Sequence, residues 1–250
     1  MTLDELKKIA KANSQLRGWD FSSISSEVSP KPWDYKTVVR QYLKPTDTVL
    51  DVGTGGGEVF LSLADAFESG IGVDQQTSMV ATAKENLANL GVQNVHFQQM
   101  EADDLAFEDE SFDMVLVKHL HVYVDEMARV LRPGGYCIVQ AVGMNSSMNM
   151  LKAFGWTPQS FGDDWWQPVS AMAPEFEANG CRVLAQAEMN VPCWFKDVES
   201  ALFFIMAVPW PERIDLDKHG PQILDYLEAS QSSRGFESNE HYGLLIVQKR

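Results

Sequence analysis

A run of glycines follows a short apolar segment at residues 48–52, and that segment contains one carboxylate, Asp51. Glycines tolerate positive φ angles and let the backbone come close to a ligand. The amides of such a loop, and the start of the helix expected after it, attract acceptor atoms and anions. The dinucleotide fingerprint GxGxxG would need its third glycine at Glu58, so that pattern is absent. The carboxylate suits a ligand with an ammonium group better than a pyrophosphate.

A second carboxylate, Asp74, ends the next apolar segment, residues 70–74. An acidic side chain at the end of this strand can accept hydrogen bonds from both hydroxyls of a ribose. The plainer interpretation is an aspartate that caps a helix or faces solvent. Its position directly after the glycine loop and the helix that follows favours the ribose-binding interpretation.

Acidic residues are dense between residues 101 and 113. The first of them follow the third predicted strand, where a carboxylate could bind the exocyclic amine of an adenine. We favour this role for Glu101 and Asp103. We interpret residues 108–110 as an acidic turn that faces solvent.

Two histidines, His119 and His121, follow the fourth predicted strand. His119 could act as a general base, because an unperturbed imidazole titrates near neutral pH. A histidine that only packs or faces solvent is the plainer alternative. Neither has a cysteine or a third histidine nearby, so we expect no metal site.

The segments that must position these residues alternate between strand and helix patterns. Such alternation indicates βαβ units and a parallel sheet covered on both faces. Ligands of these sheets bind beyond the carboxyl ends of the strands, where the candidate residues are expected. We predict strands at residues 48–52, 70–74, 95–100, 112–117, 136–142, 182–191 and 242–247, and helices at residues 3–13, 37–43, 58–67, 78–90, 124–131, 198–208 and 216–228.

The motifs, taken in order, resemble the class I S-adenosylmethionine-dependent methyltransferases, especially the type 11 group that acts on small molecules. The resemblance covers residues 36–142 firmly. It implies an α/β, Rossmann-like fold whose seven-stranded, mostly parallel sheet has the order 3-2-1-4-5-7-6, with helices on both faces. The seventh strand would be antiparallel and would lie at residues 242–247. The matching motifs are residues 49–57, 72–74, 101–107, 111–113 and 129–135.

The resemblance also implies which residues hold the cofactor. Asp51 and the glycine loop would bind the methionyl end, Asp74 the ribose, and Ala102 and Asp103 the adenine. The implied cofactor-binding residues are Asp51, Gly53, Thr54, Gly55, Gly57, Asp74, Gln75, Glu101, Ala102, Asp103 and Lys118.

The chain departs from the family pattern in two places. The family usually has Asp-Ala where this chain has Glu101-Ala102, so the carboxylate is one methylene longer. The family's segment corresponding to residues 118–128 is usually longer, so the rim that faces the acceptor differs here. Lys118 and His119 fall where the family lines the methyl-transfer cleft.

Aromatic residues are frequent before residue 36 and within residues 143–181. Their rings could stabilise a cationic methyl group by cation–π contacts, or they could simply close the edge of the core. Methyl transfer depends on the alignment of nucleophile and methyl group and on the exclusion of water. The candidates for contact with the methyl acceptor are Trp33, Tyr35, His121, Trp165 and Trp166.

The chain has 250 residues, enough for one domain with a core that needs no disulfides. We expect an N-terminal cap at residues 1–35, a cofactor-binding core at 36–142 and an insertion, which could form a lid, at 143–181. Strands and helices at residues 182–250 would complete this single domain.

The formal net charge is −15, which disfavours binding to a nucleic-acid backbone. Three scattered cysteines without a CxxC pair indicate a reducing compartment, and we expect the cytoplasm. The longest apolar run, residues 201–208, is too short to cross a bilayer, so we expect no membrane partner.

We therefore expect an enzyme that transfers a methyl group from S-adenosylmethionine to a small-molecule acceptor by in-line displacement. A nucleic-acid methyltransferase is the first alternative, and the acidic charge argues against it. A nicotinamide-dependent oxidoreductase is disfavoured by Glu58. A non-catalytic protein that binds the same cofactor is the third alternative, because this chemistry requires no particular catalytic residue. The acceptor atom and the oligomeric state stay open at this point.

Overall fold

The computed structural model describes residues 1–12, 24–162 and 167–250. They form two compact units, which we call the accessory unit and the core unit. Organisation as one domain with a cap and an insertion stays a prediction. The accessory unit consists of Met1–Pro32, Gly143–Trp166 and Met189–His241, and the core unit consists of Trp33–Val142, Gln167–Glu188 and Tyr242–Arg250.

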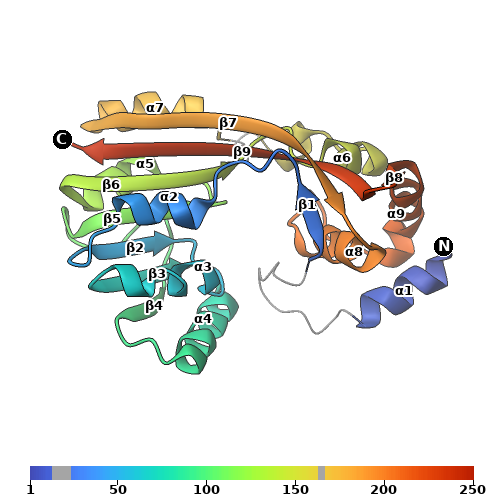
Figure 1. The fold of residues 1–250 in the computed structure, drawn as a ribbon, viewed down its shortest axis with the longest axis horizontal. Coiled ribbons are helices and arrows are strands. Elements are labelled where there is room, and N and C mark those ends of the chain that lie inside the picture. Colours follow the sequence, from blue (N-terminus) through green and yellow to red (C-terminus); the bar gives the residue numbers. More distant parts are fainter. Residues whose placement is uncertain (13–23, 163–166) are drawn as a thin grey trace. The chain divides into compact units, whose positions relative to one another are not determined.

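Parallel strands form the centre of the core unit (Figure 1). Strand β2 pairs in parallel with β3 on one side and with β5 on the other. Strand β4 continues the sheet beyond β3, and β6 continues it beyond β5, again in parallel. Their β-branched and apolar residues suit a sheet that is buried on both faces. The bounds are β2 (Thr48–Val52), β3 (Ser69–Asp74), β4 (Val95–Gln99), β5 (Phe112–Lys118) and β6 (Leu131–Val142).

Two further strands complete the predicted order. Strand β9 (Gly235–Lys249) pairs antiparallel with β6, and β7 (Cys181–Phe195) lies next to β9. The order β4-β3-β2-β5-β6-β9-β7 is the expected 3-2-1-4-5-7-6, so the order of the seven predicted strands is confirmed, although the sheet of the described residues has nine strands. Two short strands among the described residues were not predicted: β1 (Ser26–Val28) beside β7 and β8 (Gln231–Ser232) beside β9. Segments of two or three residues are too short to show a period of two.

Helices of the core unit pack on both faces of its sheet, because successive side chains of a strand point to opposite faces. On one face, Val115 belongs to a buried cluster with Met127 of α5 and Phe176 of α7. On the other face, Leu116 belongs to a cluster with Phe60 of α3. The helices of this unit are α2 (Tyr35–Tyr42), α3 (Glu58–Leu61), α4 (Thr77–Leu90), α5 (Val124–Val130) and α7 (Val169–Ala178).

The helix predicted at residues 58–67 is interrupted. It consists of α3 and a separate 3-10 turn, η1 (Ala64–Ala66). The hydroxyl of Ser62 donates to the carbonyl of Val59 at 2.7 Å, which competes with the helical hydrogen bonds. Helix α4, in contrast, ends as expected at Gly91, whose φ of 67° is typical of a glycine C-cap.

The accessory unit has its own apolar core, in which α6 and α1 pack against α9. Leu6, Met150 and Phe195 are among its fully buried side chains. None of the helices among the described residues combines the length and the hydrophobicity that a bilayer-spanning helix needs. The helices of this unit are α1 (Leu3–Ala12), α6 (Met148–Phe154), α8 (Val198–Ala207) and α9 (Leu216–Ser230), with a 3-10 turn, η2 (Pro158–Phe161).

Candidate functional site

The glycine loop turns the chain from β2 into α3. Gly53, Gly55 and Gly57 have φ angles of 72°, 56° and 76°, which residues with a side chain rarely adopt. A Cβ atom at Gly57 would also lie 2.6 Å from the ring of Phe97. Glycine is therefore required at this turn for its conformation and for its lack of a side chain.

Asp74 joins this loop to the end of β3. Its Oδ2 accepts a hydrogen bond from the backbone N–H of Gly55 at 3.0 Å, and its Oδ1 accepts one from Gln76 at 2.9 Å. Gln75 is exposed, and its carbonyl accepts from the side chain of Gln99, at the end of β4, at 3.0 Å. The structure thus brings together the glycine loop and the predicted ribose-binding residues.

Asp51 is the buried charge of this region, with 8% of its surface exposed. Burial raises the pKa of Asp51 to about 7, against the lowering effects of the Thr54 hydroxyl and the Lys118 ammonium, and nearby Asp74 raises it further. Asp51 forms no ion pair among the described residues. A carboxyl group with this pKa binds a cationic ligand most readily once it has lost its proton.

Tyr35 lies close enough to Asp51 for the two to interact electrostatically. Helix α2 begins at Tyr35 because the Asp34 carboxylate accepts a hydrogen bond from the N–H of Thr37 at 2.8 Å. Tyr35 is only 7% exposed, and its hydroxyl has no hydrogen-bond partner among the described residues. Burial and the Asp51 charge hold the pKa of Tyr35 well above its usual range. A bound ligand with a polar group could supply the hydrogen bond that this buried hydroxyl lacks.

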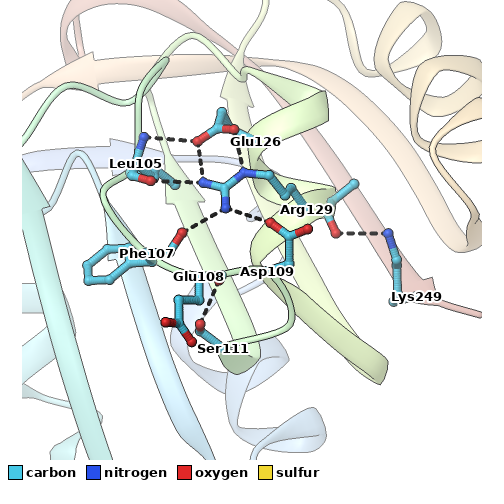
Figure 2. A network of polar contacts seen from close by, with 9 residues as sticks. Leu105, Phe107, Glu108, Asp109, Ser111, Glu126, Arg129 and Lys249 are labelled. Carbon is cyan, nitrogen blue, oxygen red and sulfur yellow. Dashed lines mark hydrogen bonds and ion pairs between the residues drawn. The ribbon is translucent and has the colours of Figure 1, made fainter.

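Arg129 holds the loop that follows β4 (Figure 2). Its guanidinium donates to both carboxylate oxygens of Glu126 at 2.7 and 2.8 Å. It also donates to the carbonyls of Leu105 and Phe107 at 2.8 and 2.7 Å, and to the Asp109 carboxylate at 2.9 Å. These five contacts use all five N–H groups of an arginine side chain.

The adenine candidates precede this clamped segment. Glu101 and Asp103 are exposed, and Ala102 is half-buried. Asp109, which we interpreted as part of a solvent-facing turn, is exposed but pairs with Arg129. The motif at residues 129–135 was noticed in the sequence, but an arginine at a helix end gave no indication of which loop it would hold.

His119 begins the turn that follows β5. Its φ is 59°, and its backbone N–H donates to the carbonyl of Gln140 on β6 at 2.8 Å. Its ring Nε2 lies 3.0 Å from the side-chain amide nitrogen of Gln140, whose oxygen accepts from the indole N–H of Trp33 at 2.8 Å. The structure thus brings Trp33 and His119 together through Gln140, a residue that the sequence analysis missed. The signal was a single amide within the apolar segment 136–142 of β6.

His119 is exposed at the surface, yet the protein atoms around its ring remove part of its hydration. This desolvation, together with the Lys118 ammonium, holds the pKa of His119 well below its usual range. Lys118 Nζ lies 3.4 Å from the ring Nδ1. His119 is therefore neutral at physiological pH.

The other acceptor candidates are placed differently. The His121 ring packs edge-on against Tyr123, with 4.9 Å between centroids, and Trp33 packs edge-on against Tyr242 at 6.4 Å. Trp165 and Trp166 lie outside the described residues.

Curated relatives of this chain are methyltransferases. The malonyl-[acyl-carrier protein] O-methyltransferase of Marinomonas sp. (strain MWYL1) is 26% identical over 176 residues, which cover 66% of this chain and 64% of that protein. The demethylmenaquinone methyltransferase of Bacillus cytotoxicus is 32% identical over 128 residues, which cover 47% of this chain and 54% of that protein. The matches thus span less than two thirds of the length of these relatives.

Solved structures share the fold. The YcgJ protein of Bacillus subtilis has a TM-score of 0.63 and 19% identity, with 86% of this chain and 98% of that chain covered. A functionally unknown protein of Deinococcus radiodurans R1 has a TM-score of 0.60 and 10% identity, with both chains fully covered. At such low identity these likenesses establish the fold alone.

The family is shown by the sequence match. Residues 43–177 match the family model described as a methyltransferase domain, and they make up more than half of the chain. This stretch contains strands β2 to β6, the glycine loop and Arg129. The chain therefore belongs to the methyltransferase domain family.

Proposed function

We propose that this chain is an S-adenosylmethionine-dependent methyltransferase that acts on a small-molecule acceptor. The observation that carries this proposal is the buried Asp51 carboxylate beside the glycine loop, with the orphaned hydroxyl of Tyr35 nearby. A buried carboxylate without an ion pair favours a ligand that brings a positive charge and further polar groups. The amino-acid end of S-adenosylmethionine has both.

The donor set fits this cofactor along its length. Asp51, Tyr35 and the loop amides would bind the methionyl end, and Asp74 with Gln75 would bind the ribose. Glu101, Ala102 and Asp103 would flank the adenine on the loop that Arg129 holds. The cofactor supplies a methyl group already activated on a sulfonium.

The protein's own contribution is then positional. The Asp51 charge complements a cationic ligand in a site shielded from water, where electrostatic attraction is strong. The turn at His119 directly follows β5, and the Trp33 indole is hydrogen-bonded to Gln140 of the neighbouring β6; an acceptor could approach there. Holding two reactants in line supplies much of the rate enhancement when the leaving group is already activated.

Two observations support a small-molecule acceptor. The net charge of −15 disfavours a nucleic-acid acceptor. Demethylmenaquinone methyltransferases, including that of Bacillus cereus (strain ATCC 10987 / NRS 248), are relatives at 31% identity, with 47% of this chain covered. A quinone-like aromatic acceptor would suit a site flanked by Trp33.

A non-methylating function on the same fold is the second candidate. The [4+2]-cyclase SpnF shares the fold with a TM-score of 0.58 and 18% identity, with 86% of this chain covered. One fold therefore hosts different chemistries, and the cofactor site does not by itself require methyl transfer.

Calorimetric titration tests the cofactor assignment. The purified chain is titrated with S-adenosylmethionine, S-adenosylhomocysteine and NAD, and the titrations are repeated with Asp74→Ala. We expect binding of the first two, weakened about 10- to 100-fold in the variant, because charge-assisted hydrogen bonds to a ribose are lost. Asp65→Ala is the matched control, since Asp65 is an exposed carboxylate that pairs with Arg40. Binding of NAD alone would overturn the proposal.

A turnover assay separates the two candidate functions. Release of S-adenosylhomocysteine is followed with a panel of quinones, phenols, amines, thiols and carboxylic acids. Turnover with any of these acceptors supports a methyltransferase. Tight cofactor binding without turnover across the panel would favour the non-methylating alternative.

A further inference from the structure

The glycine loop between β2 and α3 is held from two sides. At its start, Gly53 and Thr54 donate their backbone N–H groups to the carbonyl of Val73 on β3, both at 2.9 Å. At its end, the backbone carbonyl of Gly56 accepts a hydrogen bond from the side-chain amide of Asn86 on α4, at 2.9 Å. Asn86 thus links the loop to a helix that lies later in the chain.

The same amide nitrogen reaches a second group. Nδ2 of Asn86 lies 3.2 Å from Oε1 of Glu58, the first residue of α3. The Glu58 carboxylate folds back over the loop, because a Cβ atom placed on Gly56 would lie 2.2 Å from Oε1. An amide NH₂ has two hydrogens, so one can go to the Gly56 carbonyl and the other to the carboxylate. The two contacts fix this peptide group and the carboxylate relative to each other.

The loop needs such support because of its composition. Gly55, Gly56 and Gly57 are consecutive, and glycine loses more conformational freedom than any other residue when a structure becomes ordered. A binding loop that is ordered before its ligand arrives does not have to lose this freedom on binding. Without Asn86, the carbonyl of the buried Gly56 would have no donor among the described residues, and a buried carbonyl without a partner is costly.

The donor also suits the charge of the site. A lysine or an arginine could donate to both groups, but it would bring a positive charge to a site that we propose for a cationic ligand. The amide of Asn86 is neutral, so it leaves the negative charge of the Glu58 carboxylate in place. Asp51 precedes the loop and Asp74 contacts it, so three carboxylates lie along the loop and favour a cation.

We propose that Asn86 is a positioning residue of the cofactor site, which holds the glycine loop in its binding conformation through Gly56 and Glu58. Its effect reaches the ligand through the loop, so Asn86 itself needs no contact with the ligand. The identity of the ligand, S-adenosylmethionine, rests on the proposed function. The order of the loop in the free protein does not rest on it and can be measured without a ligand.

Hydrogen exchange of the loop amides tests the proposal in the free protein. Peptides that contain residues 53–58 are followed by mass spectrometry in the parent chain and in Asn86→Ala. We expect the loop to exchange about 10-fold faster in the variant, because hydrogen bonds that hold it are lost. Alanine has a higher helix propensity than asparagine, so α4 itself should not be weakened. Equal exchange of the loop in the two proteins would overturn the proposal.

Calorimetric titration with S-adenosylhomocysteine extends the test to binding. We expect about 10-fold weaker binding in Asn86→Ala, because the loop must then be ordered by the ligand. We expect about 100-fold weaker binding in Asn86→Asp, whose carboxylate would face the Glu58 carboxylate and the Gly56 carbonyl. Asn89→Asp is the matched control, because Asn89 is exposed about one turn further along α4 and should bind as the parent does.

The outcomes of the titration separate the two proposals. Unchanged affinity in both variants of Asn86 would overturn its positioning role. A parent chain that binds neither S-adenosylmethionine nor S-adenosylhomocysteine would overturn the proposed function, and the exchange of the loop amides would then decide the role of Asn86 by itself.

Swapping the carboxylate and the amide distinguishes a positioning role from a general loss of stability. When Asn86→Asp is combined with Glu58→Gln, the glutamine amide can donate to the new carboxylate, and the net charge is that of the parent chain. We expect the double variant to regain about 10-fold of the affinity lost in Asn86→Asp. The recovery should be partial, because the Gly56 carbonyl still lacks its donor. No recovery would overturn the proposed contact between Asn86 and Glu58 as a support of the loop.

Discussion

The loop after β4 and the turn after β5 both lie at carboxyl ends of strands in the core unit, yet they are held by opposite means. Arg129 holds the first with a permanent cation whose five N–H groups all meet acceptors. Gln140 holds the second with neutral groups, and the ring of His119 meets donors on both sides. The first arrangement secures a conformation whatever the pH. The second depends on an uncharged amide that links an indole and an imidazole.

Removing the guanidinium of Arg129 should have the largest effect on stability. Arg129→Ala leaves the Glu126 carboxylate, 17% exposed, without its partner, and leaves two loop carbonyls without donors. We expect a loss of about 3 kcal/mol in the free energy of unfolding, measured with urea. Arg40→Ala is the control, because Arg40 pairs with Asp65 at the surface and should cost about 1 kcal/mol or less. Equal losses of unfolding free energy in the two variants would mean that the contacts of Arg129 are worth no more than an ordinary surface ion pair.

Asp51, unlike the two regions compared above, should make the affinity for S-adenosylmethionine depend on pH. The pKa of Asp51 is about 7, and a cationic ligand favours its ionised form, so binding should release a proton. The affinity for S-adenosylmethionine should rise up to about tenfold per unit between pH 6 and 7 and level off above. Calorimetry in two buffers of different ionisation enthalpy counts the protons. Proton uptake would contradict the prediction, and Asp51→Asn should abolish the slope.

Breaking the contacts of Gln140 should lower the stability less than breaking those of Arg129. Trp33→Phe removes one hydrogen bond to the buried Gln140 amide. We expect a loss of about 1 kcal/mol in the free energy of unfolding, measured with urea at pH 7.5. A loss as large as that of Arg129→Ala would remove the contrast between the two regions.

The smallest expected effect is that of pH on the stability lost in Arg129→Ala, which should stay constant over a wide range. The pKa of Glu126 is lowered, chiefly by its hydrogen bonds to Arg129. A lowered carboxyl pKa contributes stability that is fully present above the unfolded value of 4.5 and is lost as the pH falls through the folded value. The difference in stability between the parent chain and Arg129→Ala should therefore stay level from pH 9 to 5.5. A stability difference that shrinks between pH 7 and 6 would show that a group other than Glu126 determines how strongly Arg129 stabilises the fold.

The sequence predicted what depends on local pattern. The glycine loop and Asp74 could be found because turn, strand end and helix start are adjacent in the chain. The order of seven strands followed from the family resemblance and is confirmed. Contacts between distant residues could not be found in this way: Trp33 lies 107 positions from Gln140, and nothing in either neighbourhood marks the pair.

The same limit explains Asp109. A run of acidic residues before a strand is typical of a solvated turn, and only the fold brings Arg129 to it from 20 positions away. Tyr35 could be chosen as a candidate from its aromatic surroundings. Its proximity to Asp51 depends on how α2 packs on the sheet.

The place of β9 between β6 and β7 also bears on how the nascent chain folds. The ribosome makes β7 before β9, and among the described strands β7 pairs otherwise only with the three residues of β1. Until residues 235–249 have been made, β6 and β7 lack the strand that lies between them. An exposed strand edge is a risk for mispairing with other chains. This part of the sheet therefore forms only after residues 235–249 have been made, and until then a chaperone that shields strand edges would help.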